Sequence, residues 1–167
     1  MKATISVLGL LFLIVVCPLF ALSVQEIDSY VQLIDSSDLE SRNVDIETQS
    51  TEGGSLQIYT LSGDTVKAVR KIFGEMGQHG QVFYFRNQEL MKLEIVKWKY
   101  NVPMYITVDN YESLGLNEYF SFENSKKTTD QYYFEKTRII DLNVESDDVL
   151  SEIEILEVVE QIGFAFQ

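Results

Sequence analysis

The chain has 167 residues, of which 46% are hydrophobic and 12% aromatic, and it contains only two prolines. This composition provides enough apolar material for one folded domain and excludes the classes of disordered and low-complexity proteins. The net charge of −13 at pH 7 disfavours binding to nucleic-acid phosphates and to anionic membrane surfaces.

Residues 1–23 have the pattern of a secretory signal peptide. A single lysine precedes an uninterrupted apolar run at residues 7–16, and small residues stand where signal peptidase requires them. The apolar run is shorter than the roughly 20 residues that a membrane-spanning helix needs. We therefore expect cleavage before Val24 and export to the periplasm or the medium. An uncleaved anchor and a lipoprotein modified at Cys17 are the alternatives.

Removal of the leader leaves residues 24–167 as a single domain with a net charge of about −14. Because Cys17 is the only cysteine, this domain has no disulfide, no cysteine nucleophile and no thiolate metal ligand. Its stability must come from packing alone, which a domain of this length can supply.

The first predicted element of the domain is an amphipathic helix at residues 24–36. Its apolar residues recur at helical spacing: Ile27, Tyr30, Val31 and Ile34. Acidic residues stand early in the segment, where the helix dipole favours them. The alternation of apolar and acidic residues at 44–47 then predicts one short edge strand before a glycine turn.

Three later segments share a pattern in which apolar residues flank a polar turn, and this pattern predicts repeated β-hairpins. The segments are residues 60–66, 84–90 and 133–139. Gly63 and Asn87 tolerate the positive φ that a tight turn between twisted strands requires. Residues 135–138 contain no such residue, so we expect a longer or less regular turn there.

Between the last two hairpins lies the least regular stretch, in which residues 109–116 predict one helical turn ending at Gly115. Residues 147–162 predict a C-terminal helix with Ser146 as its N-cap and Gly163 as its stop. The apolar stripe of that helix consists of Val149, Ile153, Leu156 and Val159. The further apolar residues in this segment are also compatible with a strand.

These elements together predict an α+β domain. We expect one antiparallel sheet, a meander of hairpins with about five to seven strands. The N-terminal and C-terminal helices are expected to cover one face of this sheet.

Several short motifs occur in order along the chain. They are Thr51-Glu52-Gly53-Gly54, Phe73-Gly74-Glu75-Met76-Gly77, Tyr84-Phe85-Arg86-Asn87, Tyr100-Asn101-Val102-Pro103-Met104-Tyr105 and Tyr132-Tyr133-Phe134. On these motifs the chain resembles a group of small uncharacterised bacterial proteins with a signal or lipoprotein leader, a short N-terminal helix and repeated Tyr-Tyr-Phe-x-Asn-Gly-x-Leu hairpins. It more distantly resembles MORN-like hairpin repeats.

The resemblance covers residues 25–142 and implies a secreted antiparallel sheet, without implying any activity. The chain departs from the pattern at Gln88, where a turn glycine is usual. It also extends into an acidic tail beyond Asn143.

The sequence lacks most residue sets for catalysis and metal binding. His79 is the only histidine and no Gly-x-Ser-x-Gly motif accompanies it, which disfavours a serine triad and a zinc site. No phosphate-binding glycine loop, dinucleotide fingerprint or calcium loop is present. We expect no enzymatic activity, no metal and no cofactor. The alternative is a carboxylate-dependent hydrolase that uses Asp109 and Glu112 in the connection at 103–116.

Aromatic residues are concentrated between Phe83 and Phe134 and fall on both alternating sets of strand positions. One face of a sheet cannot hide all of them, and exposed Tyr and Trp suit recognition of a protein or a glycan. The candidate interaction surface consists of Tyr84, Trp98, Tyr100, Tyr105 and Tyr132. The structural alternative for each of these residues is cross-strand packing within the sheet.

We therefore expect an exported, non-catalytic binding module for a protein or glycan partner. We expect no nucleic-acid partner and no membrane insertion after signal cleavage. An inhibitor-like or immunity-like role is a further alternative, because an acidic sheet can block a basic cleft. The pattern leaves the oligomeric state open.

Overall fold

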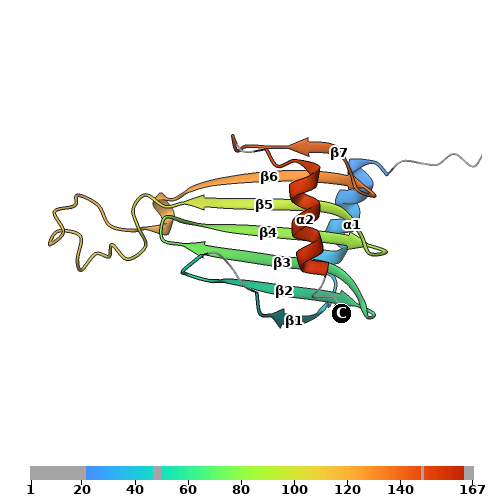
Figure 1. The fold of residues 1–167 in the computed structure, drawn as a ribbon, viewed down its shortest axis with the longest axis horizontal. Helices are drawn as coiled ribbons and strands as arrows, with labels where there is room; N and C mark the ends of the chain where they lie inside the picture. The colour runs from blue at the N-terminus through green and yellow to red at the C-terminus, as the bar shows by residue number, and fades with distance from the viewer. Residues whose placement is uncertain (1–21, 47–49, 148, 164–167) are drawn as a thin grey trace, which may run out of the picture.

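The computed structural model describes residues 22–46, 50–147 and 149–163, without the side chain of Gln161. The leader expected at residues 1–23 thus lies almost wholly outside the described residues. Seven strands form one antiparallel sheet in chain order, and two helices accompany it (Figure 1). The predicted α+β class and the meander of hairpins are confirmed.

The bounds of the elements follow the sequence pattern except near the C-terminus and at the edge strand predicted at 44–47, which the structure places earlier, at Glu40–Val44. The elements are α1 (Val24–Ser36), β1 (Glu40–Val44), β2 (Gly54–Leu61), β3 (Asp64–Gly74), β4 (Gly77–Arg86), β5 (Glu89–Lys99), the 3-10 helix η1 (Phe122–Asn124), β6 (Lys126–Glu135), β7 (Arg138–Asn143) and α2 (Glu152–Gly163). Helix α1 has the predicted bounds. A capping box between Ser23 and Glu26 starts it, with the Ser23 hydroxyl accepting from the backbone N–H of Glu26.

The three predicted hairpins join β2 to β3, β4 to β5 and β6 to β7, and all three turns lie at one end of the sheet (Figure 1). We name this end the turn end. Asn87 and Gln88 have φ values of 52° and 65°, which gives the turn that suits a twisted hairpin. Only two residues separate β6 from β7, so this turn is not longer, but it is less regular than the turn at Asn87 because only one of its two residues has a positive φ. Lys136 adopts a φ of 59° there.

The two helices pack against opposite faces of the sheet. Figure 1 shows α2 in front of the sheet and α1 behind it. Ile155 and Ile162 of α2 join a buried cluster that contains Phe83, whereas α1 joins a second cluster that contains Tyr84. Adjacent strand residues point to opposite faces. The expectation that both helices cover one face is wrong, because alternate residues of β4 supply apolar side chains to both faces.

Helix α2 begins later than the sequence pattern predicts. Ser151 caps it, since its hydroxyl accepts from the N–H of Glu154 at 3.3 Å and donates to the Glu154 carboxylate at 2.7 Å. Ser146 instead donates to the buried carboxylate of Asp130. Ile153, expected on the buried stripe, is exposed, and Ile155 is buried in its place. The predicted helix type is confirmed and its predicted N-cap is wrong, while the predicted stripe is wrong at Val149 and Ile153 and is confirmed at Val159, which packs against the core.

The end of the sheet opposite the three hairpin turns carries a long excursion. We name this end the distal end and name residues 100–125, between β5 and β6, the distal loop. Figure 1 shows the distal loop extending beyond the strands, far from both helices. Among the residues that the structure describes, no helix has the length and apolarity needed to cross a bilayer.

Candidate interaction surface

The distal loop is tied to the neighbouring turn between β3 and β4. The backbone N–H of Tyr100 donates to the carbonyl of Met76 at 2.9 Å, and the N–H of Met104 donates to the carbonyl of Glu75 at 2.9 Å. These bonds fix the first residues of the loop to a tight turn of the sheet. The base of the loop therefore has a defined position.

The loop also has a small core of its own. Ile106 is buried, and its carbonyl accepts from the N–H of Phe120 at 2.7 Å. The ring of Phe120 packs edge-on against Tyr100 with a centroid separation of 4.8 Å. Asn101 donates through Nδ2 to the carbonyl of Tyr119 at 3.0 Å. The two arms of the loop are thus joined by side-chain and backbone contacts.

At the tip of the loop a helical turn ends at Gly115, as the sequence predicts. The N–H of Gly115 donates to the carbonyl of Glu112 at 3.0 Å, and the N–H of Leu116 donates to that of Tyr111 at 3.0 Å. This is the Schellman arrangement, and it places Gly115 in the left-handed region with a φ of 70°. The tip is therefore held by backbone geometry that glycine favours.

This ordered loop presents many apolar side chains to solvent. They are Met104, Tyr105, Val108, Leu114, Leu116, Tyr119 and Phe122. The exposed fractions of Tyr105, Val108 and Leu114 are 56%, 61% and 55%. A concentration of exposed apolar surface on an ordered segment is typical of a protein interaction site. The neighbouring turn adds exposed Met76.

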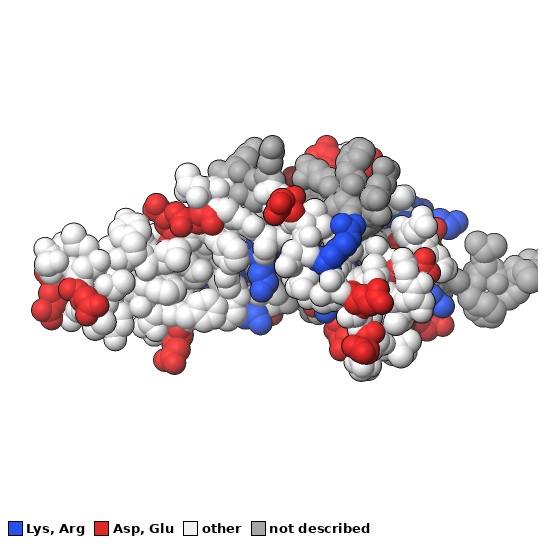
Figure 2. All heavy atoms as spheres, turned by 90° about the horizontal axis from the view of Figure 1, so that it is seen from below, with Lys and Arg blue, Asp and Glu red and all other residues white. Residues whose placement is uncertain are grey.

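The charges of the loop are all negative. Its four acidic residues are exposed, and the sequence from 100 to 125 contains no lysine or arginine. The acidic residues are Asp109, Glu112, Glu118 and Glu123. Figure 2 shows Asp and Glu but no Lys or Arg at the projecting end, whereas Lys and Arg groups appear farther back along the molecule, among other Asp and Glu groups. A partner that contacts the loop must combine apolar and basic groups.

The five aromatic residues predicted for the interaction surface are not brought together. Tyr84 is buried beneath α1, where its hydroxyl donates to Asp35 at 3.1 Å, and burial raises its pKa. Tyr132 is buried on the opposite face, where its hydroxyl accepts from the N–H of Leu150 at 3.0 Å. These two residues belong to the two cores.

The other three residues lie at the distal end. Tyr100 is buried at the base of the loop, Tyr105 is exposed on the loop, and Trp98 is half-buried on β5. Sequence reasoning missed the aliphatic residues Val108 and Leu114, because it followed aromatic residues in alternating strands. The available signal was their position in the least regular stretch of the chain, outside the predicted strands.

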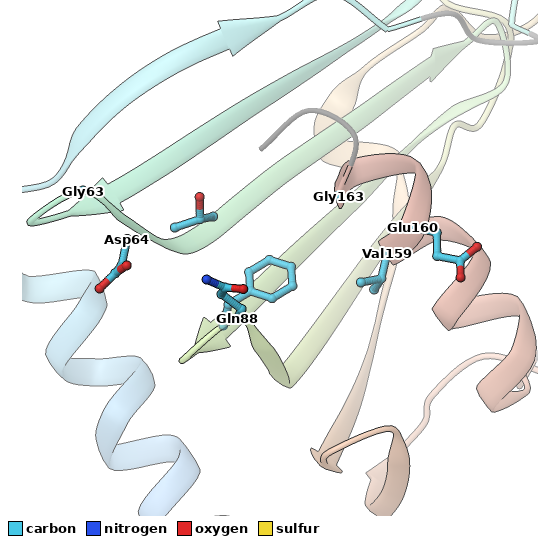
Figure 3. Close-up of a pocket in the computed structure, with 8 residues that line it drawn as sticks. Gly63, Asp64, Gln88, Val159, Glu160 and Gly163 are labelled. Atoms are coloured by element: carbon cyan, nitrogen blue, oxygen red, sulfur yellow. The ribbon is translucent and has the colours of Figure 1, made fainter. Parts of the chain in front are cut away.

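A separate cavity of about 530 Å³ lies at the turn end, between two hairpin turns and the end of α2 (Figure 3). Its carboxylates belong to Asp64 and Glu160, both exposed. Figure 3 shows them on opposite sides of the cavity, with Gln88 between them, pointing away from each other. Acid and base groups for glycoside hydrolysis must instead face one bond.

The carboxylates proposed from the sequence for hydrolysis also lie away from the cavity at the turn end. Asp109 and Glu112 are exposed on the distal loop, and Glu112 accepts a hydrogen bond from the Tyr111 hydroxyl at 2.9 Å. Neither lines the cavity of Figure 3. Within the described residues, no group of three or more His, Cys, Asp or Glu side chains is placed to hold a metal ion.

The distal loop is thus the feature of the described chain with the strongest character of an interaction site. No protein-family model, curated protein or solved structure matches this chain.

Proposed function

We propose that the chain is an exported binding module that recognises a protein through its distal loop. The observation that carries the proposal is the set of exposed apolar side chains on this ordered loop, led by Tyr105, Val108 and Leu114. Export rests on the sequence pattern of residues 1–23. The module needs no cofactor and no metal for this function.

A protein partner suits the surface better than a glycan partner. The exposed side chains include the aliphatic residues Met104, Val108, Leu114 and Leu116 as well as tyrosines. Apolar side chains of mixed shape gain free energy by packing into the apolar core of a partner interface. A sugar ring carries many hydroxyl groups, and burying these against aliphatic side chains without hydrogen bonds costs free energy.

The internal contacts of the loop support recognition with little loss of conformational entropy. The Phe120 to Ile106 hydrogen bond and the turn at Gly115 hold the loop before any partner arrives. A surface that is ordered in advance avoids the cost of immobilising its backbone during association. We expect a partner to find the loop in its binding conformation.

An inhibitor-like or immunity-like role is the second candidate, and the protruding shape of the loop favours it. The loop extends beyond the strands and carries exposed acids together with apolar groups (Figures 1 and 2). Such a protrusion can enter a concave cleft with a basic lining. In this case the partner would be an enzyme or a toxin, and binding would block its cleft.

The experiment compares capture of partners by three forms of the full chain, each with its leader and an affinity tag after Gln167. The first is the wild type, and the second carries Tyr105→Ser, Val108→Ser and Leu114→Ser. The control carries Ile140→Ser, Leu142→Ser and Ile153→Ser, which also replace exposed apolar residues but lie on β7 and α2.

We expect a partner that the wild type and the control retain and that the loop variant loses. Equal capture by the loop variant and the control would refute the proposal, as would the lack of any specific partner in envelope and culture-medium fractions. Circular dichroism and thermal unfolding of each form establish that the comparison is between folded proteins. The fraction in which the tagged chain accumulates tests export separately.

A further inference from the structure

The face of the sheet that α1 crosses has a hollow beside this helix, toward the distal end. Lys71, Gly80 and Val96 are neighbours in β3, β4 and β5, and they lie on the same face as Tyr84. Gly80 contributes no side chain to this row. A cavity of about 220 Å³ lies over it.

The walls of the hollow are mostly apolar. Val69 and Val82 form the side toward α1, Val96 forms another side, and Trp98 forms the side toward the distal end. All four are partly exposed. Three residues with polar groups, Lys71, Gln78 and His79, also line it. An apolar pocket with a few polar groups at its edge is the usual construction of a binding site.

The ion pairs that helix α1 forms with the sheet lie on the turn-end side of this hollow and do not reach it. Asp35 pairs with Lys67 at 2.6 Å, and Asp28 pairs with Lys92 at 2.8 Å. Both lysines are paired with Tyr84 of β4. Tyr84 lies closer to the turn end than Gly80, by two side-chain positions on this face of the strand. The hollow is therefore an accessible part of the face that α1 otherwise covers.

The hollow adjoins the distal loop through Trp98. Phe122, an exposed residue of that loop, packs against the ring of Trp98 with a centroid separation of 4.4 Å. One partner could thus contact the loop and the hollow at the same time. This contact makes the hollow a second part of the surface that we assign to recognition.

The charge near the hollow is opposite to that of the loop. Lys71 is exposed at its rim, and the ammonium group of exposed Lys127 lies 5.5 Å from the Trp98 ring centroid. The nearby carboxylate of Glu94 is already paired with Lys92 at 2.9 Å. In a chain with a net charge of −13, this is a local positive patch that favours carboxylates.

We propose that the hollow over Gly80 receives one apolar side chain from an acidic segment of the partner, and this inference rests on the proposed function. The hollow is smaller than the roughly 300–1,000 Å³ of pockets for drug-sized molecules, so it suits a single side chain. Carboxylates beside that side chain pair with Lys71 and Lys127. Single buried anchors of this kind carry much of the binding free energy of protein interfaces.

The test uses purified full chain and three capped peptides of defined sequence. The probe is Gly-Ser-Glu-Glu-Leu-Glu-Glu-Ser-Gly, the second peptide has alanine for leucine, and the third has lysines for the glutamates. Trp98 is the only tryptophan in the chain, so its fluorescence and its indole N–H resonance both report on this site. We expect saturable binding of the probe and affinities at least about tenfold weaker for the other two peptides.

The decisive variant is Gly80→Val, which fills the hollow. A Cβ at this position meets its nearest atom, the carbonyl oxygen of Val96, at 3.7 Å, so the sheet can accept it without rearrangement. We expect this variant to keep or raise the thermal stability of the protein and to lose about tenfold in affinity for the probe.

A matched pair of charge reversals tests the acidic preference. Lys71→Glu places a negative charge at the rim and should weaken binding of the probe by about threefold or more. Lys99→Glu makes the same charge change on the opposite face of the sheet and should leave the affinity unchanged.

The proposal is overturned if no peptide gives a saturable change, if all three peptides bind equally, or if Gly80→Val binds the probe like the wild type. The proposed function is judged by a different result, the capture of a partner by loop variants. Binding of the probe without loop-dependent capture would refute the proposed function alone. Loop-dependent capture without binding of the probe would refute this inference alone.

Discussion

The ammonium group of Lys92, in the middle of the sheet, lies 2.8 Å from the Oδ1 atom of Asp28 on α1. The same ammonium group lies 2.9 Å from Glu94 and 4.9 Å from the ring centroid of Tyr133. Burial lowers the pKa of Lys92, but its hydrogen bonds to Asp28 and Glu94 outweigh burial and raise the pKa above its usual value. Lys92 is therefore charged when it holds α1 against the sheet.

This arrangement predicts unequal effects for the two partners. Asp28→Ala removes one partner of a buried cation and should lower the free energy of unfolding by about 1–2 kcal/mol. Lys92→Met should cost less, because methionine fills a similar space and the Asp28 side chain, 40% exposed, regains water. Urea unfolding measures both. Glu157→Ala, at an exposed position of α2, is the control. A larger loss for Lys92→Met than for Asp28→Ala would contradict this account.

The environment of Asp130 predicts that the free energy of unfolding falls at acidic pH. Burial raises its pKa, but hydrogen bonds from the Ser146 hydroxyl and from the N–H groups of Ser146 and Glu145 outweigh burial and lower it. A carboxyl whose pKa is lower in the folded state stabilises the fold above its unfolded pKa, and this stabilisation is lost as the pH falls below that value.

We expect the wild type to lose more unfolding free energy between about pH 5 and pH 2 than Asp130→Asn does, because only the wild type must protonate this carboxyl. Unfolding in urea at several pH values measures the difference. Glu123→Asn, on the exposed 3-10 helix of the distal loop, should keep the pH dependence of the wild type. Parallel curves for the wild type and Asp130→Asn would refute the prediction.

The start of α2 is tested by serine replacements. Ser151→Ala removes the N-cap and should cost about 1 kcal/mol, whereas Ser151→Asp should be nearly neutral because aspartate caps as well as serine. Ser146→Asp should be strongly destabilising, because its carboxylate would face Asp130, which the serine hydroxyl now contacts at 2.6 Å. Thermal unfolding distinguishes these effects. If aspartate were tolerated at 146 and not at 151, the assigned cap would be wrong.

The turn between β4 and β5 can be improved. Gln88 has a φ of 65°, a conformation that glycine adopts without steric cost and that the second position of this turn type favours. We expect Gln88→Gly to raise the free energy of unfolding by about 0.5–1 kcal/mol. Glu89→Gly, one residue later at the start of β5, should lower it. Equal effects at the two positions would show that the turn conformation does not limit stability.

Local patterns predicted most of this fold because they depend on few residues at a time. The spacing of Ile27, Val31 and Ile34 identifies α1, and those residues are its buried ones. The polar turns at Gly63 and Asn87 identify two hairpins with little help from distant residues. The order of the strands then follows, because each strand pairs with the next.

The relations that sequence reasoning missed depend on distant contacts. Serine is a common helix N-cap, but the hydroxyl of Ser146 donates to Asp130 instead. The N-cap of α2 is therefore Ser151. The faces that the two helices cover depend on which side of the sheet each connection takes. Which residues of the candidate surface are accessible to solvent also depends on which parts of the sheet the helices cover. Tyr84 and Tyr132 are strand residues like Trp98, but each belongs to a buried cluster that includes residues of a helix.

The base of the distal loop determines which changes in the loop sequence the fold can tolerate. Lys99 and Lys126 are paired neighbours in β5 and β6, although the whole loop separates them along the chain. Because the pairing of β5 with β6 already brings the two ends of the loop together, the loop can be shortened or exchanged without a new strand arrangement. Mutations could therefore change the length and sequence of the loop while the two packed faces near the turns keep the domain folded. The same separation makes the sheet a scaffold on which other loops could be placed.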